Sequence, residues 1–238
     1  MNELLLSIRK NAIGLGLFAI VTAGSIGVAQ VLTFDSIKHN VQVAQAKALH
    51  EIVPSSDYDN DLLNDTVTLS KAALEKSGVI WNTRLLGPLA DDAVAYVART
   101  NGKPHTVILP VTAPDGYTTH IKMIVGIKLD GTLAGVRVIE HKETPGLGDK
   151  IEVKKNPWIL QFPGLSLLNP EEDAWAVKKD GGDFDQFTGA TITPRAVVRS
   201  IRLALEFYQK YGKELVETAN SNLSRSNTAK KESMTDGN

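Results

Sequence analysis

The strongest pattern along the chain is an uninterrupted apolar run near its N-terminus. No residue from Asn11 to Phe34 carries a charged side chain. A helix needs about 20 residues to cross the hydrocarbon core of a bilayer at about 1.5 Å per residue, so this run is long enough to span a membrane. A cleaved signal peptide is the alternative, although its apolar region usually covers only about 7 to 15 residues. We predict an uncleaved membrane anchor within residues 1–34.

The charges next to this run predict its orientation. Arg9 and Lys10 flank its N-terminal end. Because positively charged flanks stay on the cytoplasmic side, the N-terminus is expected in the cytoplasm and everything after Phe34 across the membrane. Ionisable residues inside a membrane span normally mark ion pathways, and this span has none. The anchor therefore offers no ion pathway of its own.

Two further segments border the predicted globular part. Apolar residues recur at steps of three and four from Ile37 to Ile52, which predicts a helical stem, followed by an Asp-rich loop, over residues 35–60. Residues 213–238 contain few large apolar side chains and are predicted to form a polar, disordered tail. The globular domain is therefore expected over residues 61–212.

The middle of the chain alternates β-rich runs with turn signals. Asn101-Gly102 and Asp130-Gly131 each separate two such runs. A type I′ turn needs a positive φ at both central positions, so both pairs predict hairpins in an antiparallel sheet. Residues 194–212 have helical apolar spacing and end at a glycine, which predicts a helix packed on that sheet. The predicted fold class is α+β: one transmembrane helix, then an extracytoplasmic domain with an antiparallel sheet and packed helices.

Composition removes several classes of chemistry. The 26 Lys and Arg residues against 27 Asp and Glu give no basic excess, so no nucleic-acid partner is predicted. The chain has no cysteine, which excludes disulfides, thiol catalysis and cysteine-ligated iron–sulfur clusters. Its five histidines are scattered without metal-ligand spacing, and no metal site is predicted. A redox role would therefore have to use an organic cofactor.

The segment DQFTGAT ends at Thr191, directly before the predicted helix. Thr193 is a good N-cap and Pro194 is favoured at the first helical position, so Thr191 is predicted to lie just outside the helix. The free N–H groups and the dipole of a helix start favour phosphate, and Gly189 with Ala190 would let a ligand approach the backbone. A tight turn that only caps the helix explains the same residues. The loop by itself leaves both interpretations open.

Wider similarity adds a more specific prediction. DQFTGAT, from Asp185 to Thr191, resembles the D-x-x-[S/T]-G-A-T motif of covalent flavoproteins, in which a flavin transferase attaches FMN through a phosphoester to the last threonine. ETPGLGDKI, which starts at Glu143, resembles a second signature of FMN-binding domains. These domains occur in the G subunit of the Rnf/Rsx electron-transport complex and in the C subunit of the sodium-translocating NADH:quinone oxidoreductase. With TAPDGY and the run Trp175–Val198, the motifs are most similar to the first of these, the RnfG/RsxG family.

The resemblance implies a set of FMN-binding residues. Thr191 would carry covalent FMN through its phosphoryl group, and Asp185 would serve transferase recognition or loop geometry. Lys178 would place a positive charge near the flavin, although a Lys-Lys pair is as often a solvated turn. Glu143 and Thr144 would make polar contacts with the flavin. The remaining residues implied in the two motifs are Thr188, Gly189, Ala190, Pro145, Gly146, Leu147 and Gly148.

The resemblance also implies a function and partners. It indicates a membrane-anchored electron-carrier subunit of an ion-translocating oxidoreductase complex, located in the bacterial inner membrane with its main domain in the periplasm. Its partners would be the other Rnf/Rsx subunits, a flavin transferase for maturation and the membrane itself. No complete enzymatic activity is expected from this chain alone, and no catalytic residue is assigned. The alternative is an anchored module that binds a phosphorylated ligand reversibly without a redox role.

Overall fold

The computed structural model describes residues 2–70, 74 and 79–235, so the last three residues of the predicted tail lie outside the described part. The chain divides into two compact units, residues 1–45 and 46–238. Helix α1 (Asn2–Ile52) contributes to both units. This division differs from the predicted boundaries after residues 34 and 60, because the end of α1 and the Asp-rich loop pack with the globular unit.

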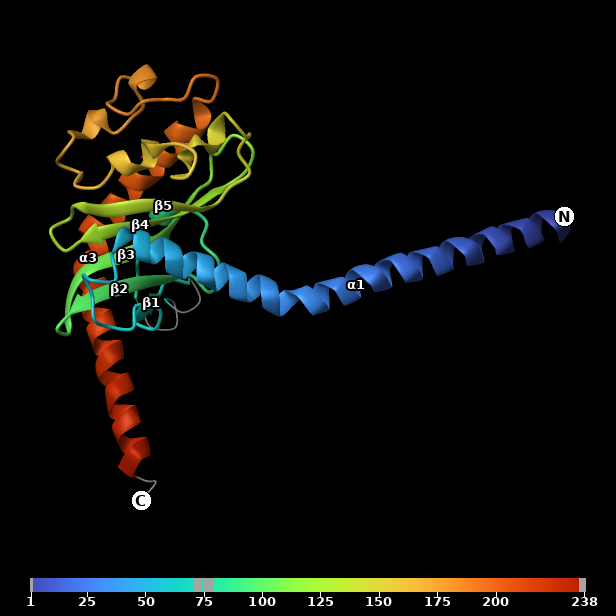
Figure 1. Cartoon of the computed structure of the whole chain (residues 1–238), viewed down its shortest axis with the longest axis horizontal. Coiled ribbons are helices and arrows are strands. Elements are labelled where there is room, and N and C mark those ends of the chain that lie inside the picture. Colours follow the sequence, from blue (N-terminus) through green and yellow to red (C-terminus); the bar gives the residue numbers. More distant parts are fainter. Residues whose placement is uncertain (1, 71–73, 75–78, 236–238) are drawn as a thin grey trace. The chain divides into compact units, whose positions relative to one another are not determined.

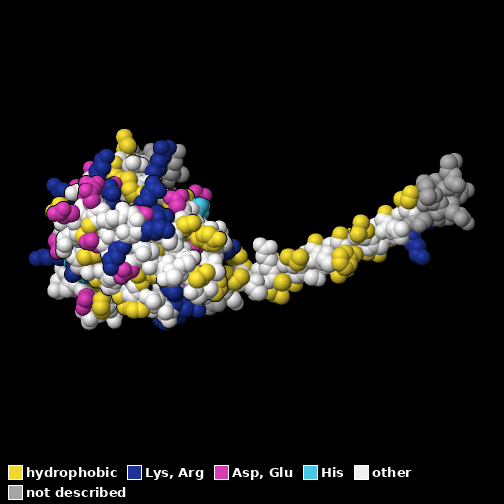
Figure 2. All heavy atoms as spheres, turned by 90° about the horizontal axis from the view of Figure 1, so that it is seen from above, with side chains coloured by type: hydrophobic (Ala, Val, Ile, Leu, Met, Phe, Trp, Pro, Cys, Tyr) yellow, Lys and Arg dark blue, Asp and Glu magenta, His cyan; other side chains and the backbone are white. Residues whose placement is uncertain are grey.

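Helix α1 contains the apolar run predicted as an anchor. Ile8–Phe34 is a helical stretch of 27 residues with a mean hydropathy of 2.0, and it is the one helix of the described residues that is long and apolar enough to cross a membrane. Thr22 Oγ1 donates to the Phe18 carbonyl at 2.8 Å, and Ser25 Oγ donates to Val21 at 2.7 Å. Such bonds satisfy hydroxyl groups where no water is present. Figure 2 shows hydrophobic side chains along this stretch and basic side chains at its N-terminal end.

The second unit is built on a five-stranded antiparallel sheet with the order β1-β2-β3-β4-β5, in which sequence neighbours pair in space (Figure 1). Its longest ladder joins β3 to β4 without a register shift. The predicted α+β class with an antiparallel sheet is therefore confirmed. The strands are β1 (Thr66–Thr68), β2 (Val94–Thr100), β3 (Lys103–Ala113), β4 (Ile121–Lys128) and β5 (Leu133–Glu140).

Both predicted hairpins occur, but their turns differ. Asn101 and Gly102 have φ angles of 52° and 73°, as a two-residue type I′ turn requires. The connection between β4 and β5 is longer, residues 129–132, and Asp130 has no positive φ angle. The Asp130 carboxylate instead accepts hydrogen bonds from the N–H and hydroxyl of Thr132 at 2.9 and 2.7 Å. The type I′ turn predicted at this position is wrong, because the side chain stabilises a wider loop.

The two faces of the sheet pack against different helices. Helix α3 (Ile192–Thr235) covers one face, and the end of α1 covers the other. Leu49 and Ile52 from α1 pack with Ile108 of β3, so the end of the predicted stem is part of a hydrophobic core. Successive β3 side chains alternate between the two faces. Those on the α3 side are Val107, Leu109, Val111 and Ala113.

Helix α3 extends well beyond its predicted end at Gly212. Leu215 and Ala219 in this extension are 0% and 1% exposed. Asn220 accepts a hydrogen bond at its Oδ1 from Nη1 of the buried Arg99 at 2.6 Å. A glycine inside a helix costs only about 1 kcal/mol relative to alanine, which the burial of two apolar side chains offsets. The predicted helix end is therefore wrong, and the start of the predicted disordered tail is packed helix.

Leu215→Ala tests whether this extension contributes to the stability of the domain. Deleting a fully buried leucine side chain should lower the free energy of unfolding by about 2 to 5 kcal/mol. The measurement is chemical denaturation of the full chain in detergent, followed by tryptophan fluorescence. Leu223→Ala is the matched control, because Leu223 is 36% exposed on the same helix and should cost less than about 1 kcal/mol. Similar small losses for both variants would contradict the packing.

Candidate functional site

The two sequence motifs meet at one cavity of about 290 Å³. Three segments that are distant in sequence form its walls: the connection between β3 and β4, the loop after β5, and the start of α3 with the loop before it. The short helix η2 (Gly148–Ile151) contacts α3 and brings the second motif to the helix start. The lining residues are Tyr117, Glu143, Thr144, Leu147, Gly148, Gly189, Ala190, Thr191, Ile192 and Thr193.

Buried aromatic side chains hold the loop that precedes α3. Phe184 and Phe187 are 3% and 7% exposed and pack against Phe162 and Trp158, with ring centroids 5.1 and 5.2 Å apart. The indole N–H of Trp158 also donates to the Asp185 carbonyl at 2.8 Å. Edge-to-face and stacked rings restrict one another in both position and orientation. These contacts therefore fix the loop that carries the polar residues of DQFTGAT.

Gly189 forms part of a tight turn in this loop. The Ala190 N–H donates to the Phe187 carbonyl at 3.0 Å, and Gly189 has a φ angle of 82°. A positive φ at the third residue is typical of a type II turn, and glycine adopts it without strain. The sequence left open a tight turn or a loop that a ligand can approach. Gly189 fits both, because it makes the turn and also lines the cavity.

Thr191 lies immediately before the first residue of α3, as predicted. The Arg195 N–H donates to the Thr191 carbonyl at 3.4 Å, which closes the first turn. The predicted helix start at Thr193 and Pro194 is wrong by two residues. Thr193 is fully buried in the first turn, and its hydroxyl donates to the Glu143 carboxylate, so it does not act as the N-cap.

Glu143 is 4% exposed and is the charged side chain among the described residues that line the cavity. Its carboxylate accepts hydrogen bonds from the backbone N–H groups of Tyr117 at 3.2 Å and Thr118 at 3.0 Å. The Thr193 hydroxyl is the third donor. The sequence predicts a polar contact with the ligand at Glu143, but its oxygen atoms already bind protein donors.

Positive charge at the cavity comes from the backbone. Among the described lining residues there is no lysine or arginine. Arg195, in the first turn of α3, forms hydrogen bonds with Asp180, and these lower the pKa of the Asp180 carboxyl from its ordinary value. An anionic group in the cavity would therefore depend on the free N–H groups and the dipole of α3.

Several predicted binding residues lie outside the cavity walls. Lys178 and Asp185 form an exposed ion pair, with Nζ and Oδ1 2.7 Å apart and side chains 56% and 67% exposed. Thr188, Pro145 and Gly146 are exposed as well, and none of these residues lines the cavity. The geometry thus gathers part of each motif, while a direct role for Lys178 stays a prediction. The motif residues that line the cavity are Glu143, Thr144, Leu147, Gly148, Gly189, Ala190 and Thr191.

The cavity also includes residues that were not assigned from the sequence. Tyr117 and Ile192 are 66% and 44% exposed and line it together with Leu147, which is 40% exposed. Exposed apolar side chains grouped around a cavity are typical of binding sites. For Tyr117, the sequence signal that could have indicated a role was the motif TAPDGY, which ends at this residue. We call these three side chains the apolar rim.

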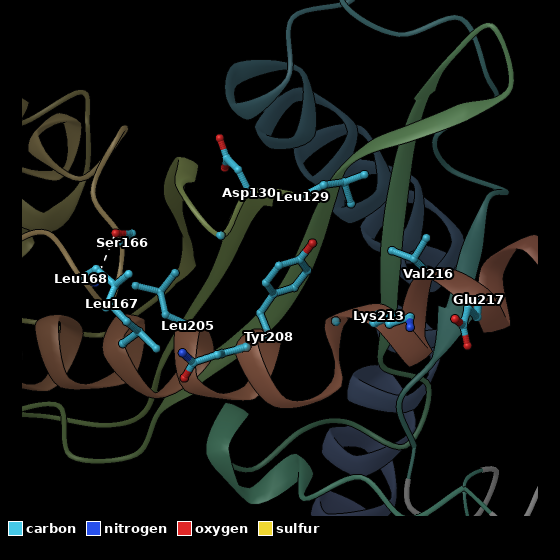
Figure 3. A pocket seen from close by; sticks show the side chains of 13 residues that line it. Leu129, Asp130, Ser166, Leu167, Leu168, Leu205, Tyr208, Lys213, Val216 and Glu217 are labelled. Atoms are coloured by element: carbon cyan, nitrogen blue, oxygen red, sulfur yellow. Dashed lines mark hydrogen bonds between the residues drawn. The ribbon is translucent and has the colours of Figure 1, made fainter.

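A second cavity of about 560 Å³ lies farther along α3 (Figure 3). The Tyr208 hydroxyl points into it, and burial, with a smaller contribution from the charge of Asp130, raises the pKa of Tyr208 to about 12. At about 1.5 Å per residue, Tyr208 is about 24 Å along the helix from Ile192. No motif residue lines this second cavity. The smaller cavity is therefore the candidate site.

Comparison with known families identifies the domain that contains this cavity. Residues 116–206 match the family model of the FMN-binding domain. This match contains both motifs and all residues that line the candidate cavity. Residues 1–52, which contain all of α1, match the family model of the RnfG N-terminal region.

Relatives of known name are similar over most of the chain. The G subunit of the ion-translocating oxidoreductase complex of Vibrio atlanticus (strain LGP32) is 43% identical over 210 residues, which cover 88% of this chain and 94% of the relative. The G subunit of Pseudomonas aeruginosa (strain UCBPP-PA14) is 46% identical over 202 residues, 85% of this chain and 89% of the relative. That of Shewanella oneidensis is 42% identical over 207 residues, covering 87% and 92%. The similarity thus extends over the anchor, the sheet and the start of α3.

Gly148→Ala tests the close contact between the second motif and α3. A Cβ at this position would lie 2.8 Å from Thr193 Oγ1 and 2.9 Å from Glu143 Cβ. Overpacking of this kind should lower the free energy of unfolding by about 1 to 3 kcal/mol, measured by chemical denaturation. Adding Thr193→Ala removes the nearest atom, Thr193 Oγ1. The free energy of unfolding of the double variant should therefore fall by less than the sum of the decreases in the two single variants. Strict additivity would mean that the two segments do not touch.

Proposed function

We propose a function from the premise that this chain belongs to the G-subunit family of ion-translocating oxidoreductase complexes. The chain carries an FMN-binding domain and works as a membrane-anchored electron carrier of such a complex. FMN is linked covalently to Thr191 by a phosphoester. The observation that carries this proposal is the position of Thr191 at the start of α3, in the wall of a cavity where both FMN-binding motifs meet.

The residues of the cavity fit the different parts of FMN. Small-molecule pockets usually measure about 300 to 1,000 Å³, so a cavity at the lower end of this range accommodates part of the molecule. The apolar rim offers Tyr117, Leu147 and Ile192 for packing against an aromatic ring system. The start of α3 suits a phosphate group. When bound, FMN supplies reversible uptake of one or two electrons, which no side chain of this cysteine-free chain provides.

Attachment requires a separate enzyme. The Thr191 hydroxyl is partly exposed and has no hydrogen-bond partner within the described residues. A threonine hydroxyl is a poor nucleophile unless a base or a second enzyme activates the reaction, and the oxygens of Glu143 are already bonded to three donors. We assign the step to a flavin transferase that uses FAD and Mg²⁺. The Thr191 oxygen forms a bond to the flavin-side phosphorus, the pyrophosphate bond breaks, AMP leaves, and the hydroxyl proton passes to the transferase.

The membrane anchor limits what this protein contributes to ion transport. The span Ile8–Phe34 carries basic residues only near its N-terminal end, so other members of the complex provide the ion pathway. The domain lies on the periplasmic side, where a flavin lost by dissociation is not readily replaced. A covalent tether keeps the electron carrier in place under those conditions.

Thr191→Ala tests the attachment site. Wild-type chain co-expressed with its flavin transferase should give a fluorescent band on a denaturing gel and an added FMN in its intact mass. Thr191→Ala should lose both signals completely, because no oxygen remains to form the phosphoester. Thr68→Ala is the matched control and should keep them, since Thr68 is exposed on β1, outside both motifs and the cavity. Wild-type protein that binds flavin only reversibly would instead support the phosphorylated-ligand alternative.

Single-cysteine labelling tests the orientation, because the natural chain contains no cysteine. In intact spheroplasts, a membrane-impermeant maleimide should label Ser221→Cys, which lies at an exposed position of the domain. It should not label Ser7→Cys before the membrane is broken, because positive residues hold that end in the cytoplasm. The opposite labelling pattern would reverse the proposed topology.

A further inference from the structure

Glu143 joins the three walls of the candidate cavity through one buried carboxylate. Its Oε1 accepts from the Thr118 N–H at 3.0 Å, and its Oε2 accepts from the Tyr117 N–H at 3.2 Å and from the Thr193 hydroxyl. Glu143 itself belongs to the loop after β5, whereas its donors come from the connection between β3 and β4 and from the first turn of α3. The carboxylate therefore ties both neighbouring walls to its own loop.

The surroundings hold this carboxylate in place. A Cβ built at Gly116 would lie 3.1 Å from Oε1, and one at Gly148 would lie 3.1 Å from Oε2. The main chain is fixed as well, because the Glu143 N–H donates to Nδ1 of His141 at 3.0 Å. The other ring nitrogen of His141 lies 2.8 Å from Glu152 Oε1. The carboxylate thus has little freedom to turn away from the cavity.

The charge of Glu143 faces the cavity, and no lysine or arginine among the described lining residues compensates it. Backbone N–H groups can only donate, so both carboxylate oxygens act as acceptors, as the ionised form does. Within the described part of the chain, no lysine or arginine lines this cavity. A charge that is screened little by water acts more strongly on a neighbouring charge than the same charge at the surface.

We propose that Glu143 lowers the reduction potential of the flavin bound in this cavity. Electrons that arrive from a donor subunit bring negative charge to the flavin before the acceptor subunit removes it, and a fixed carboxylate at the cavity wall disfavours that charge. This inference rests on the proposed function, because it requires FMN at Thr191. It assigns Glu143 a role through charge, in place of the direct polar contact predicted from the sequence. Through Thr193 it also positions the first turn of α3.

Glu143→Gln tests this role, because glutamine keeps the shape of the side chain and removes its charge. Its NH2 group also replaces one acceptor oxygen, so the effect of geometry is measured separately below. Redox titration of the purified, flavin-loaded full chain in detergent should show a midpoint potential more positive than that of the wild type. Intact mass should confirm the loading independently of any electron-transfer activity. Glu140→Gln is the matched control, since that carboxylate is 58% exposed and paired with Lys122, and its removal should leave the potential unchanged.

Two further variants separate charge from geometry. Thr193→Val removes a donor but keeps the carboxylate, so the potential should stay at or below the wild-type value. Glu143→Asp keeps the charge and shortens the side chain, so the potential should stay closer to the wild type than in Glu143→Gln. If the glutamine variant does not acquire FMN, Glu143→Met is the second neutral variant. If neither acquires FMN, the aspartate variant decides: a midpoint potential near the wild-type value supports the role of the charge, and a large positive shift contradicts it.

The outcomes distinguish this inference from the proposed function. A loaded Glu143→Gln chain with the wild-type potential would overturn the role of Glu143 and leave covalent FMN intact. An equal positive shift in Glu143→Gln and Glu143→Asp would also overturn it, because geometry alone would then explain the change. Wild-type chain that never acquires covalent FMN would refute the proposed function itself.

Discussion

The packing of α3 against one face of the sheet is the constraint on which the candidate site depends. Val197, Ile201 and Leu205 recur every four residues along the helix and are at most 2% exposed. Burying each such side chain contributes about 1.5 to 3 kcal/mol, so the first turns of α3 cannot shift without loss of core packing. Because the helix is held this way, its free N–H groups lie at a fixed place beside the second motif. The position of Thr191 therefore follows from the core.

Opposite electrostatic effects meet at this helix start. The first turn of α3 is favourable for phosphate, because unpaired N–H groups and the helix dipole place partial positive charge there. The carboxylate of Glu143, bonded to Thr193 in the same turn, adds a full negative charge at the same cavity. The phosphate end and the ring end of a bound flavin need not experience the same field. One short region can thus hold an anion by its backbone and disfavour further negative charge through a side chain.

Local signals in the sequence predicted most of the fold, and the errors have physical causes. Asn101-Gly102 formed the expected turn because both residues adopt a positive φ readily, whereas the Asp130 side chain bonded to Thr132 and selected a wider loop. Gly212 suggested a helix end, but tertiary burial beyond it outweighed its weak helix propensity. Each of the two motifs supplies one wall of the candidate cavity, and binding of FMN there stays a proposal. The role of Glu143 depends on donors from distant segments, and no local pattern specifies such partners.

The domain contains two kinds of buried carboxylate, and the contrast supports a functional reason for one of them. Asp65 is 9% exposed and is compensated by Arg99, with Oδ2 and Nε 2.6 Å apart. Burying an ion is costly unless it is paired and hydrogen-bonded, and the Asp65–Arg99 pair meets both conditions. Glu143 has hydrogen bonds but no lysine or arginine beside it in the described cavity wall. The ionised carboxylate joins the three walls through two acceptor oxygens, whereas the NH2 group of a glutamine cannot accept from a backbone N–H. The wall contacts thus bring a charge to the cavity that no neighbouring cation in the described wall offsets, and electron transfer is the process that would respond to it.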